Sequence, residues 1–150
     1  MLPATSRRVP EQTSDAINAQ IRQEMEQRIA MYRDASKYEI DRRLRELDEE
    51  WDVERTLEAN ASTLAFIGCA MSTRDRRWLA LPLAVTAFLF QHAIQGWCPP
   101  LPILRRMGFR TMREIDEERQ ALKVLGGDYR DMASGDRQPS TAQVLEAVVR

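Results

Sequence analysis

The longest apolar stretch of the chain runs from Trp78 to Trp97 and contains no charged side chain. It follows a pair of arginines and ends just before a Cys-Pro-Pro sequence, whose prolines lack an amide donor and stop a helix. A helix that crosses a bilayer needs about 20 mainly apolar residues, and this stretch has that length. Tryptophans at both ends match the aromatic belts of membrane interfaces. We therefore predict a membrane-spanning helix over about 78–98, with Trp78 and Trp97 at the membrane interface.

A second, shorter apolar window covers about 56–72 and is separated from the first by the sequence TRDRR. We expect it to form the first arm of a hairpin, because it is too short and too polar to span a bilayer alone. Small residues recur at helical spacing on both arms, which lets two helices approach closely in lipid. The predicted packing residues are Ala61, Ala65 and Cys69 on the first arm and Ala80, Ala84 and Ala87 on the second.

The polar parts of the chain show helical periodicity of a different kind. Apolar residues recur every four positions over about 14–32, which indicates an amphipathic helix with a mostly solvated surface. Capping boxes predict helix starts at Ser36 and Thr111, followed by helices over about 36–55 and 111–125. Their apolar positions, which we expect to be interaction residues, are Ile40, Leu44, Leu47, Trp51, Ile115, Leu122 and Leu125.

No alternation typical of strands occurs, so the sequence predicts an all-α fold. The expected segments are a disordered arm (1–12), an amphipathic helical segment (13–55), the hairpin (56–110), an amphipathic helix (111–127) and a tail with a possible short helix (128–150). No helix breaker separates 36–55 from the first apolar window, so one helix could continue from Ser36 to about Ser72. Whether the amphipathic helices pack within one chain or across a dimer stays open at this point.

Charge and composition narrow the function classes. The chain has 22 basic and 23 acidic residues, a net charge of -1, which argues against nucleic acid as a partner. One histidine and two separated cysteines predict neither a metal centre nor a disulfide framework, and no cofactor is expected. Arginines flank both ends of the hairpin, and the larger number lies on the side of the two termini, which favours cytoplasmic termini.

Cys98 is the sharpest candidate for chemistry. An antiparallel hairpin places it near Arg55 in depth, and Arg105 and Arg106 follow in the sequence. Nearby arginines lower the pKa of a thiol and raise its thiolate fraction, so Cys98 could carry a persulfide or sense oxidants. The simpler alternative is a small packing residue at the end of a helix. Cys69 lies near the turn, too far from Cys98 at helical rise for a disulfide.

The sequence GWCPPLPILRRMGFRT, followed by EIDEERQALKVLGGDY, resembles small bacterial proteins related to the transmembrane domain of the inner-membrane rhodanese YgaP. The matching positions are Gly96-Trp97-Cys98-Pro99 and Gly108, and the resemblance covers about 55–112. It implies a helical hairpin in the bacterial inner membrane. It does not imply sulfurtransferase activity, because neither cysteine begins a loop like the catalytic loop of a rhodanese.

These observations favour a non-enzymatic inner-membrane protein that acts as an anchor, assembly or interaction subunit through its cytoplasmic helices. Its expected partners are the lipid bilayer and either a second copy or a larger membrane complex. Two alternatives stay open: a thiol or persulfide relay that uses Cys98, and a soluble helical adaptor whose core contains both apolar windows.

Overall fold

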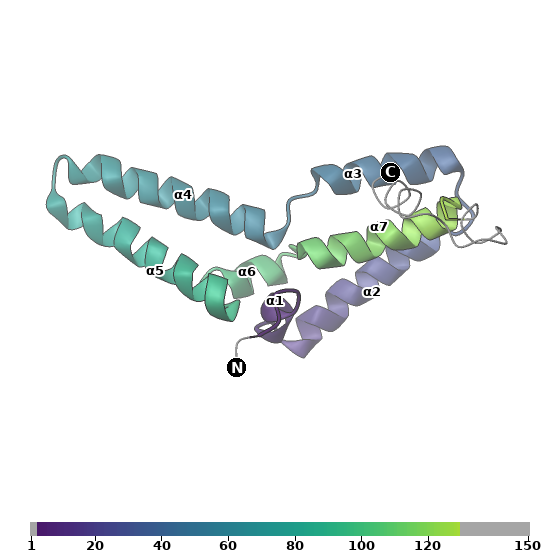
Figure 1. The fold of residues 1–150 in the computed structure, drawn as a ribbon, viewed down its shortest axis with the longest axis horizontal. Coiled ribbons are helices and arrows are strands. Elements are labelled where there is room, and N and C mark those ends of the chain that lie inside the picture. The colour runs from purple at the N-terminus through teal and green to yellow at the C-terminus, as the bar shows by residue number, and fades with distance from the viewer. Residues whose placement is uncertain (1–2, 130–150) are drawn as a thin grey trace, which may run out of the picture. The chain divides into compact units, whose positions relative to one another are not determined.

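The computed structural model describes residues 3–129, and every regular element among them is a helix (Figure 1). The all-α prediction is confirmed for this part of the chain. The tail helix expected within 128–150 falls almost entirely outside the described residues. The elements are α1 (Arg8–Glu11), α2 (Asp15–Met31), α3 (Lys37–Glu49), α4 (Val53–Ser72), the 3-10 helix η1 (Arg76–Leu79), α5 (Ala80–Gln95), α6 (Leu101–Arg106) and α7 (Met112–Gly126).

The chain forms two compact units, and neither is a continuous stretch of sequence. The first unit contains Met1–Gln23 and Trp51–Ile115, and the second contains Glu24–Glu50 and Asp116–Arg150. Helices α2 and α7 each contribute one part to each unit. The segments expected from the sequence were contiguous, because long-range packing leaves no local signal from which a discontinuous unit can be recognised.

The first unit contains an antiparallel hairpin of α4 and α5, joined by η1 (Figure 1). Helix α4 does not continue α3, although the sequence left this possible: Glu50 is extended with a ψ of 130°, which ends α3. The Asp52 side chain then accepts a 2.8 Å hydrogen bond from the amide of Arg55 and caps α4. Helix α5 ends at Gly96, whose φ of 78° is left-handed, a conformation that glycine adopts without steric cost.

Gly68 is the point of closest approach between the two arms. A Cβ atom at this position would lie 2.5 Å from Cδ of Pro82 and 3.2 Å from the carbonyl oxygen of Trp78. Ala61 and Ala65 lie half-buried on the same side of α4, whereas Cys69 is exposed. The close-packing stripe of α4 therefore runs through Ala61, Ala65 and Gly68, and differs by one position from the expected one.

The second arm uses a different face from the one expected. Ala80, Ala84 and Ala87 are exposed. The apolar residues of this arm that are partly covered are larger, and they are Leu81, Pro82, Val85 and Leu89. Helix α5 is apolar around its whole circumference, so its sequence could not indicate which side faces α4. Gly68 on α4 lets the two helices approach closely, and the second arm packs the bulky side chains of Leu81 and Pro82 against it.

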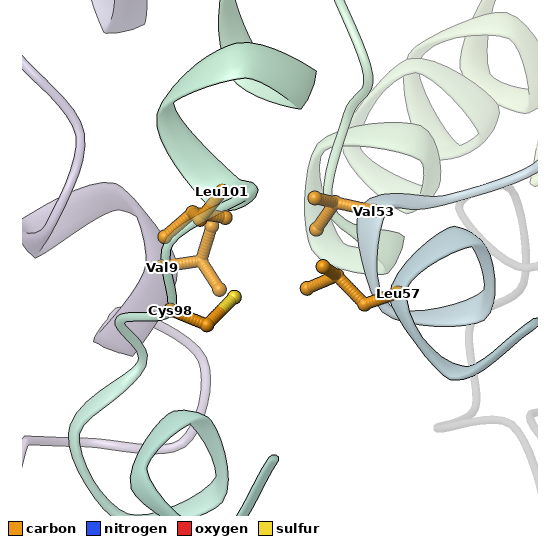
Figure 2. Packing of buried hydrophobic residues seen from close by; sticks show 5 residues of the cluster. All are labelled: Val9, Val53, Leu57, Cys98 and Leu101. Atoms are coloured by element: carbon orange, nitrogen blue, oxygen red, sulfur yellow. The ribbon is translucent and has the colours of Figure 1, made fainter. Parts of the chain in front are cut away.

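The base of the hairpin holds the core of the first unit (Figure 2). Five buried side chains meet there: Val9, Val53, Leu57, Cys98 and Leu101. Two of them come from segments that the sequence did not predict to be helical. Val9 belongs to α1, within the expected disordered arm, and Leu101 belongs to α6, which follows the Pro99-Pro100 pair. Both segments are short, and each contributes one apolar residue to this core.

The second unit combines α3 with the parts of α2 and α7 assigned to it. Ile40, Leu47 and Leu122 are buried, and Leu44 and Leu125 are half-buried. This packing occurs within one chain. Two further predicted interaction residues, Trp51 and Ile115, belong to the first unit instead.

A buried carboxylate organises the polar side of this second unit. Glu118 is fully buried and accepts hydrogen bonds from Arg28 at 3.1 Å and from Arg43 at 2.9 Å. Arg119 pairs with Asp48 at 2.7 Å, and Lys37 pairs with Asp128 at 2.6 Å. The two arginine side chains are 27% and 16% exposed and balance the charge of the fully buried carboxylate, which would otherwise be costly to bury. These ion pairs join α7 to α2 and α3.

Candidate functional site

The outer surface of the hairpin is the most unusual surface of the described chain. The segment Arg76–Gln95 is long and apolar enough to cross a membrane, with a mean hydropathy of 1.3, and only 6% of its apolar window is buried. A core helix of a soluble protein is mostly buried, whereas this one packs mainly against α4 and leaves most of its apolar surface uncovered. The large exposed apolar side chains of the hairpin are Leu64, Phe66, Ile67, Trp78, Leu79, Leu83, Phe88, Phe90 and Ile94.

Helix α4 shares this surface only over its second half. It does not qualify as a membrane span by itself, and Arg76–Gln95 is the single candidate span among residues 3–129. Its exposed apolar side chains begin at Leu64, while Glu58 and Asn60 in its first half are exposed. The apolar surface is therefore widest near the turn and narrows on the α4 side toward the base.

Polar side chains along the hairpin mostly bond to their own helix. The hydroxyl groups of Thr63 and Thr86 each donate a 2.8 Å hydrogen bond to the carbonyl four residues earlier, and the Asn60 amide does the same at 2.8 Å. Ser72 and Thr73 donate to carbonyls three residues earlier. Such back-bonding satisfies polar groups without water or a partner, which is what a helix in hydrocarbon requires.

Exposed arginines lie at both ends of the hairpin. At the turn they are Arg74, Arg76 and Arg77, and the Asp75 side chain accepts from the Arg77 amide at 2.9 Å. At the base, Arg55 stacks over the ring of Trp51 at 4.6 Å from its centroid. The predicted interface residues Trp78 and Trp97 lie at the start of the apolar segment and just beyond its end, with Trp78 exposed and Trp97 half-buried.

Cys98 is a core residue in this structure. It is 4% exposed and lies among apolar side chains (Figure 2). Burial raises the pKa of its thiol, and a hydrogen bond from the Leu101 amide opposes this only in part. The three arginines expected beside it are engaged elsewhere or face solvent: Arg105 binds a carboxylate, Arg55 covers Trp51, and Arg106 is exposed. The arrangement that would activate the thiol is not formed, and the packing alternative describes this position.

His92 is a buried polar residue of α5. The charged groups that act on it are Arg8 and Glu54. Both of its ring nitrogens are buried and lack a hydrogen-bond partner among the described residues. Arg8 donates to Glu54 at 2.5 Å and to the carbonyl of Ala93 at 3.2 Å. The contribution of Arg8 could not be found from the sequence, because Arg8 belongs to the N-terminal segment, which is distant in the sequence from α5.

Arg105 is the most deeply buried cation of the first unit. Its guanidinium donates to both oxygens of Glu114, to the carbonyl of Phe109 at 3.0 Å and to the side-chain oxygen of Asn18 at 3.0 Å. Glu114 also accepts from the Thr111 amide at 2.7 Å, and the Thr111 hydroxyl accepts from the Glu114 amide at 3.3 Å. The predicted capping box at Thr111 is therefore confirmed. Arg105, which we expected near Cys98 as an activating charge, holds the structure together instead.

Two further observations concern possible metal-binding side chains and similarity to known proteins. Residues 3–129 contain no group of three or more histidine, cysteine, aspartate or glutamate side chains that could hold a metal ion. No protein-family model, no curated protein and no solved structure matches this chain. The exposed apolar hairpin therefore stands as the candidate functional surface.

Proposed function

We propose that this protein is a non-enzymatic membrane protein, which inserts the α4–α5 hairpin into a bilayer and serves as an anchor or assembly subunit. The observation that carries the proposal is the segment Arg76–Gln95, which is long and apolar enough to span a membrane yet is 6% buried. Contiguous apolar surface of this kind marks an interaction site or a membrane site.

The energetic argument rests on the large side chains of the hairpin. Removing a leucine or phenylalanine side chain from water contributes about 1.5–3 kcal/mol. Phe66, Leu83 and Phe90 are each roughly two-thirds or more exposed to water in the described chain. Together with the other exposed apolar side chains, their transfer into hydrocarbon supplies on the order of 10 kcal/mol, and the back-bonded hydroxyl groups add little opposing cost.

The second unit supplies the part that remains in water. Its helices carry a dense set of ion pairs around Glu118, which is incompatible with hydrocarbon. We assign both termini to the cytoplasm by the positive-inside rule, and the resemblance to the YgaP-like domain supports a bacterial inner membrane. Interaction with a second copy or with a larger complex would then occur through these water-exposed helices.

The thiol relay and the soluble adaptor are each less well supported than the membrane function. A thiol relay needs an accessible thiolate, and Cys98 is buried with a raised pKa. A soluble adaptor needs a second molecule to cover the hairpin, since α4 covers only one side of α5. This second alternative predicts a defined oligomer in the absence of detergent.

The deciding experiment is fractionation of cells that express the chain, with a carbonate wash followed by detergent extraction and sizing. We expect the protein to stay with the membranes through the wash and to be recovered only in detergent. The matched variants are L83K/F90K, which places two charges on the hairpin surface, and Y38K, which places one on the exposed surface of the second unit. The first variant should leave the membrane fraction and the second should stay. Recovery of the unmodified chain as a soluble oligomer would overturn the proposal.

A further inference from the structure

We propose that α6 lies in the headgroup layer of an anionic bilayer, beside the base of the hairpin, with Ile103 and Met107 inserted between the lipids. This inference rests on the proposed membrane function and deepens it, because it names a second contact surface and the class of lipid that this surface recognises. The surface, here called the α6 face, consists of Ile103, Arg106 and Met107.

Helix α6 has two chemically different sides. Its inner side carries Leu101 and Arg105, both buried. Its outer side carries Ile103, and Met107 follows as the residue that caps its C-terminal end; the two are 60% and 67% exposed. Most of the surface of these two large apolar side chains is therefore left uncovered by the described chain, and insertion between lipids would remove it from water.

The position of α6 relative to the hairpin is fixed by the core. Leu101 packs in the same cluster as Val53 and Leu57, which belong to the first turns of α4 (Figure 2). The Arg105 side chain ties the end of α6 to Glu114 and Asn18. When the hairpin is inserted, α6 is therefore held at the end where the apolar segment Arg76–Gln95 finishes, which is the level of the lipid headgroups.

The charge on the α6 face selects the lipid. Arg106 is exposed and lies between Ile103 and Met107 on the same helix. An arginine beside inserted apolar side chains can extend to the water interface, where its guanidinium donates to phosphate oxygens. Arg55, above Trp51, adds a second exposed guanidinium at the base. The α6 face itself contains one cation, Arg106, and no carboxylate. On α4, Glu54 is paired with Arg8 and Glu58 is exposed.

The experiment uses the full chain with Cys69→Ser, so that the buried Cys98 is the one remaining cysteine, and adds single cysteines for an environment-sensitive fluorophore. The test positions are I103C and M107C. The matched controls are F90C, on the hairpin and 68% exposed, and Y38C, in the second unit and 70% exposed. The C69S protein without a further cysteine serves as the labelling blank. Each labelled protein is reconstituted into vesicles of phosphatidylcholine, with or without phosphatidylglycerol.

In anionic vesicles we expect several-fold brighter emission from I103C and M107C than from Y38C, with quenching by lipids that carry a nitroxide near the headgroup. F90C should be quenched most strongly by a nitroxide deep in the acyl chain. If F90C lies in lipid while I103C and M107C behave like Y38C, the inference is overturned and the proposed function stands. If F90C also behaves like Y38C, the proposed function fails and the inference fails with it.

The choice of lipid has its own test. Replacing Arg106 by glutamine in the I103C protein should reduce the difference in emission between anionic and neutral vesicles. Replacing Lys37, in the second unit, by glutamine should leave that difference unchanged. An R106Q protein that keeps the full difference would overturn the assignment of anionic lipid to the α6 face.

Discussion

Arg105 and Glu114 form two parallel hydrogen bonds of 2.7 Å and 2.8 Å, which join the end of α6 to the first turn of α7. The arginine side chain is fully buried and the carboxylate is largely so. A bidentate arginine–carboxylate pair is among the strongest polar interactions in proteins, and this pair also receives the Thr111 amide and reaches Asn18. It therefore ties the neighbouring helices α6 and α7 to Asn18 of α2, which is distant in the sequence.

Replacing Arg105 by alanine should lower the free energy of unfolding by roughly 3–5 kcal/mol, because it leaves a buried carboxylate without its counter-charge. Chemical denaturation in detergent, followed by circular dichroism, measures this loss. The neighbouring variant R106A removes an exposed arginine and should change stability by less than about 0.5 kcal/mol. Equal losses of unfolding free energy in R105A and R106A would show that the Arg105–Glu114 pair stabilises the protein no more than an exposed arginine does.

The same pair predicts a pH dependence. Burial by itself raises the pKa of Glu114, but its hydrogen bonds with Arg105 and with the Thr111 amide outweigh burial and hold the pKa below the ordinary value. A lowered folded pKa means that the folded state binds the proton less tightly than the unfolded chain. The contribution of Glu114 is therefore complete above its ordinary pKa and is lost as the pH falls through the lower folded value.

The stability of the unmodified protein and of E114Q, measured at a series of pH values, checks this direction. We expect the difference in unfolding free energy to be constant near neutral pH and to shrink below about pH 4, where an unperturbed glutamate takes up a proton. A difference in unfolding free energy between the two proteins that grows as the pH falls would contradict a lowered pKa of Glu114.

Gly68 should tolerate no side chain while Pro82 remains opposite it. A Cβ atom there would lie 2.5 Å from Cδ of the proline, so G68A forces the two arms apart. Overpacking of this kind costs about 1–3 kcal/mol, and thermal unfolding in detergent should show it. C69A changes the exposed neighbour and should have almost no effect. Since P82A removes the opposing ring atom, adding it to G68A should recover part of the loss, and a failure to recover would place the strain elsewhere.

The two cysteines should differ sharply in reactivity. Cys69 is exposed and Cys98 is buried, and burial raises the pKa of the Cys98 thiol. In the detergent-solubilised folded protein, a small apolar maleimide that enters the micelle should therefore label Cys69 at least about tenfold faster than Cys98, because protein side chains enclose Cys98 and the thiolate is the reactive form. Both should react once the chain is unfolded in denaturant. Rapid labelling of Cys98 in the folded C69S protein would revive the relay hypothesis.

The local signals of the sequence were sufficient for most helices. Capping boxes at Ser36 and Thr111 predicted two helix starts that the structure has, because a cap depends only on residues within one turn. The amphipathic segment expected over 14–32 corresponds to α2, which spans Asp15–Met31. The apolar composition of 78–98 likewise identified the helix whose apolar window is only 6% buried.

The tertiary structure decided which residues meet. Helix α5 is apolar on all sides, so the sequence could not show that its alanines are exposed while Pro82 faces Gly68. Helices α1 and α6 are too short to be recognised from periodicity. Val9 is the buried residue of α1, and Leu101 and Arg105 are the buried residues of α6. The largest difference between the prediction and the structure concerns the surroundings of Arg105. Adjacent sequence suggested a role beside Cys98, whereas a carboxylate on the next helix holds the guanidinium, because a buried charge lies where its counter-charge is.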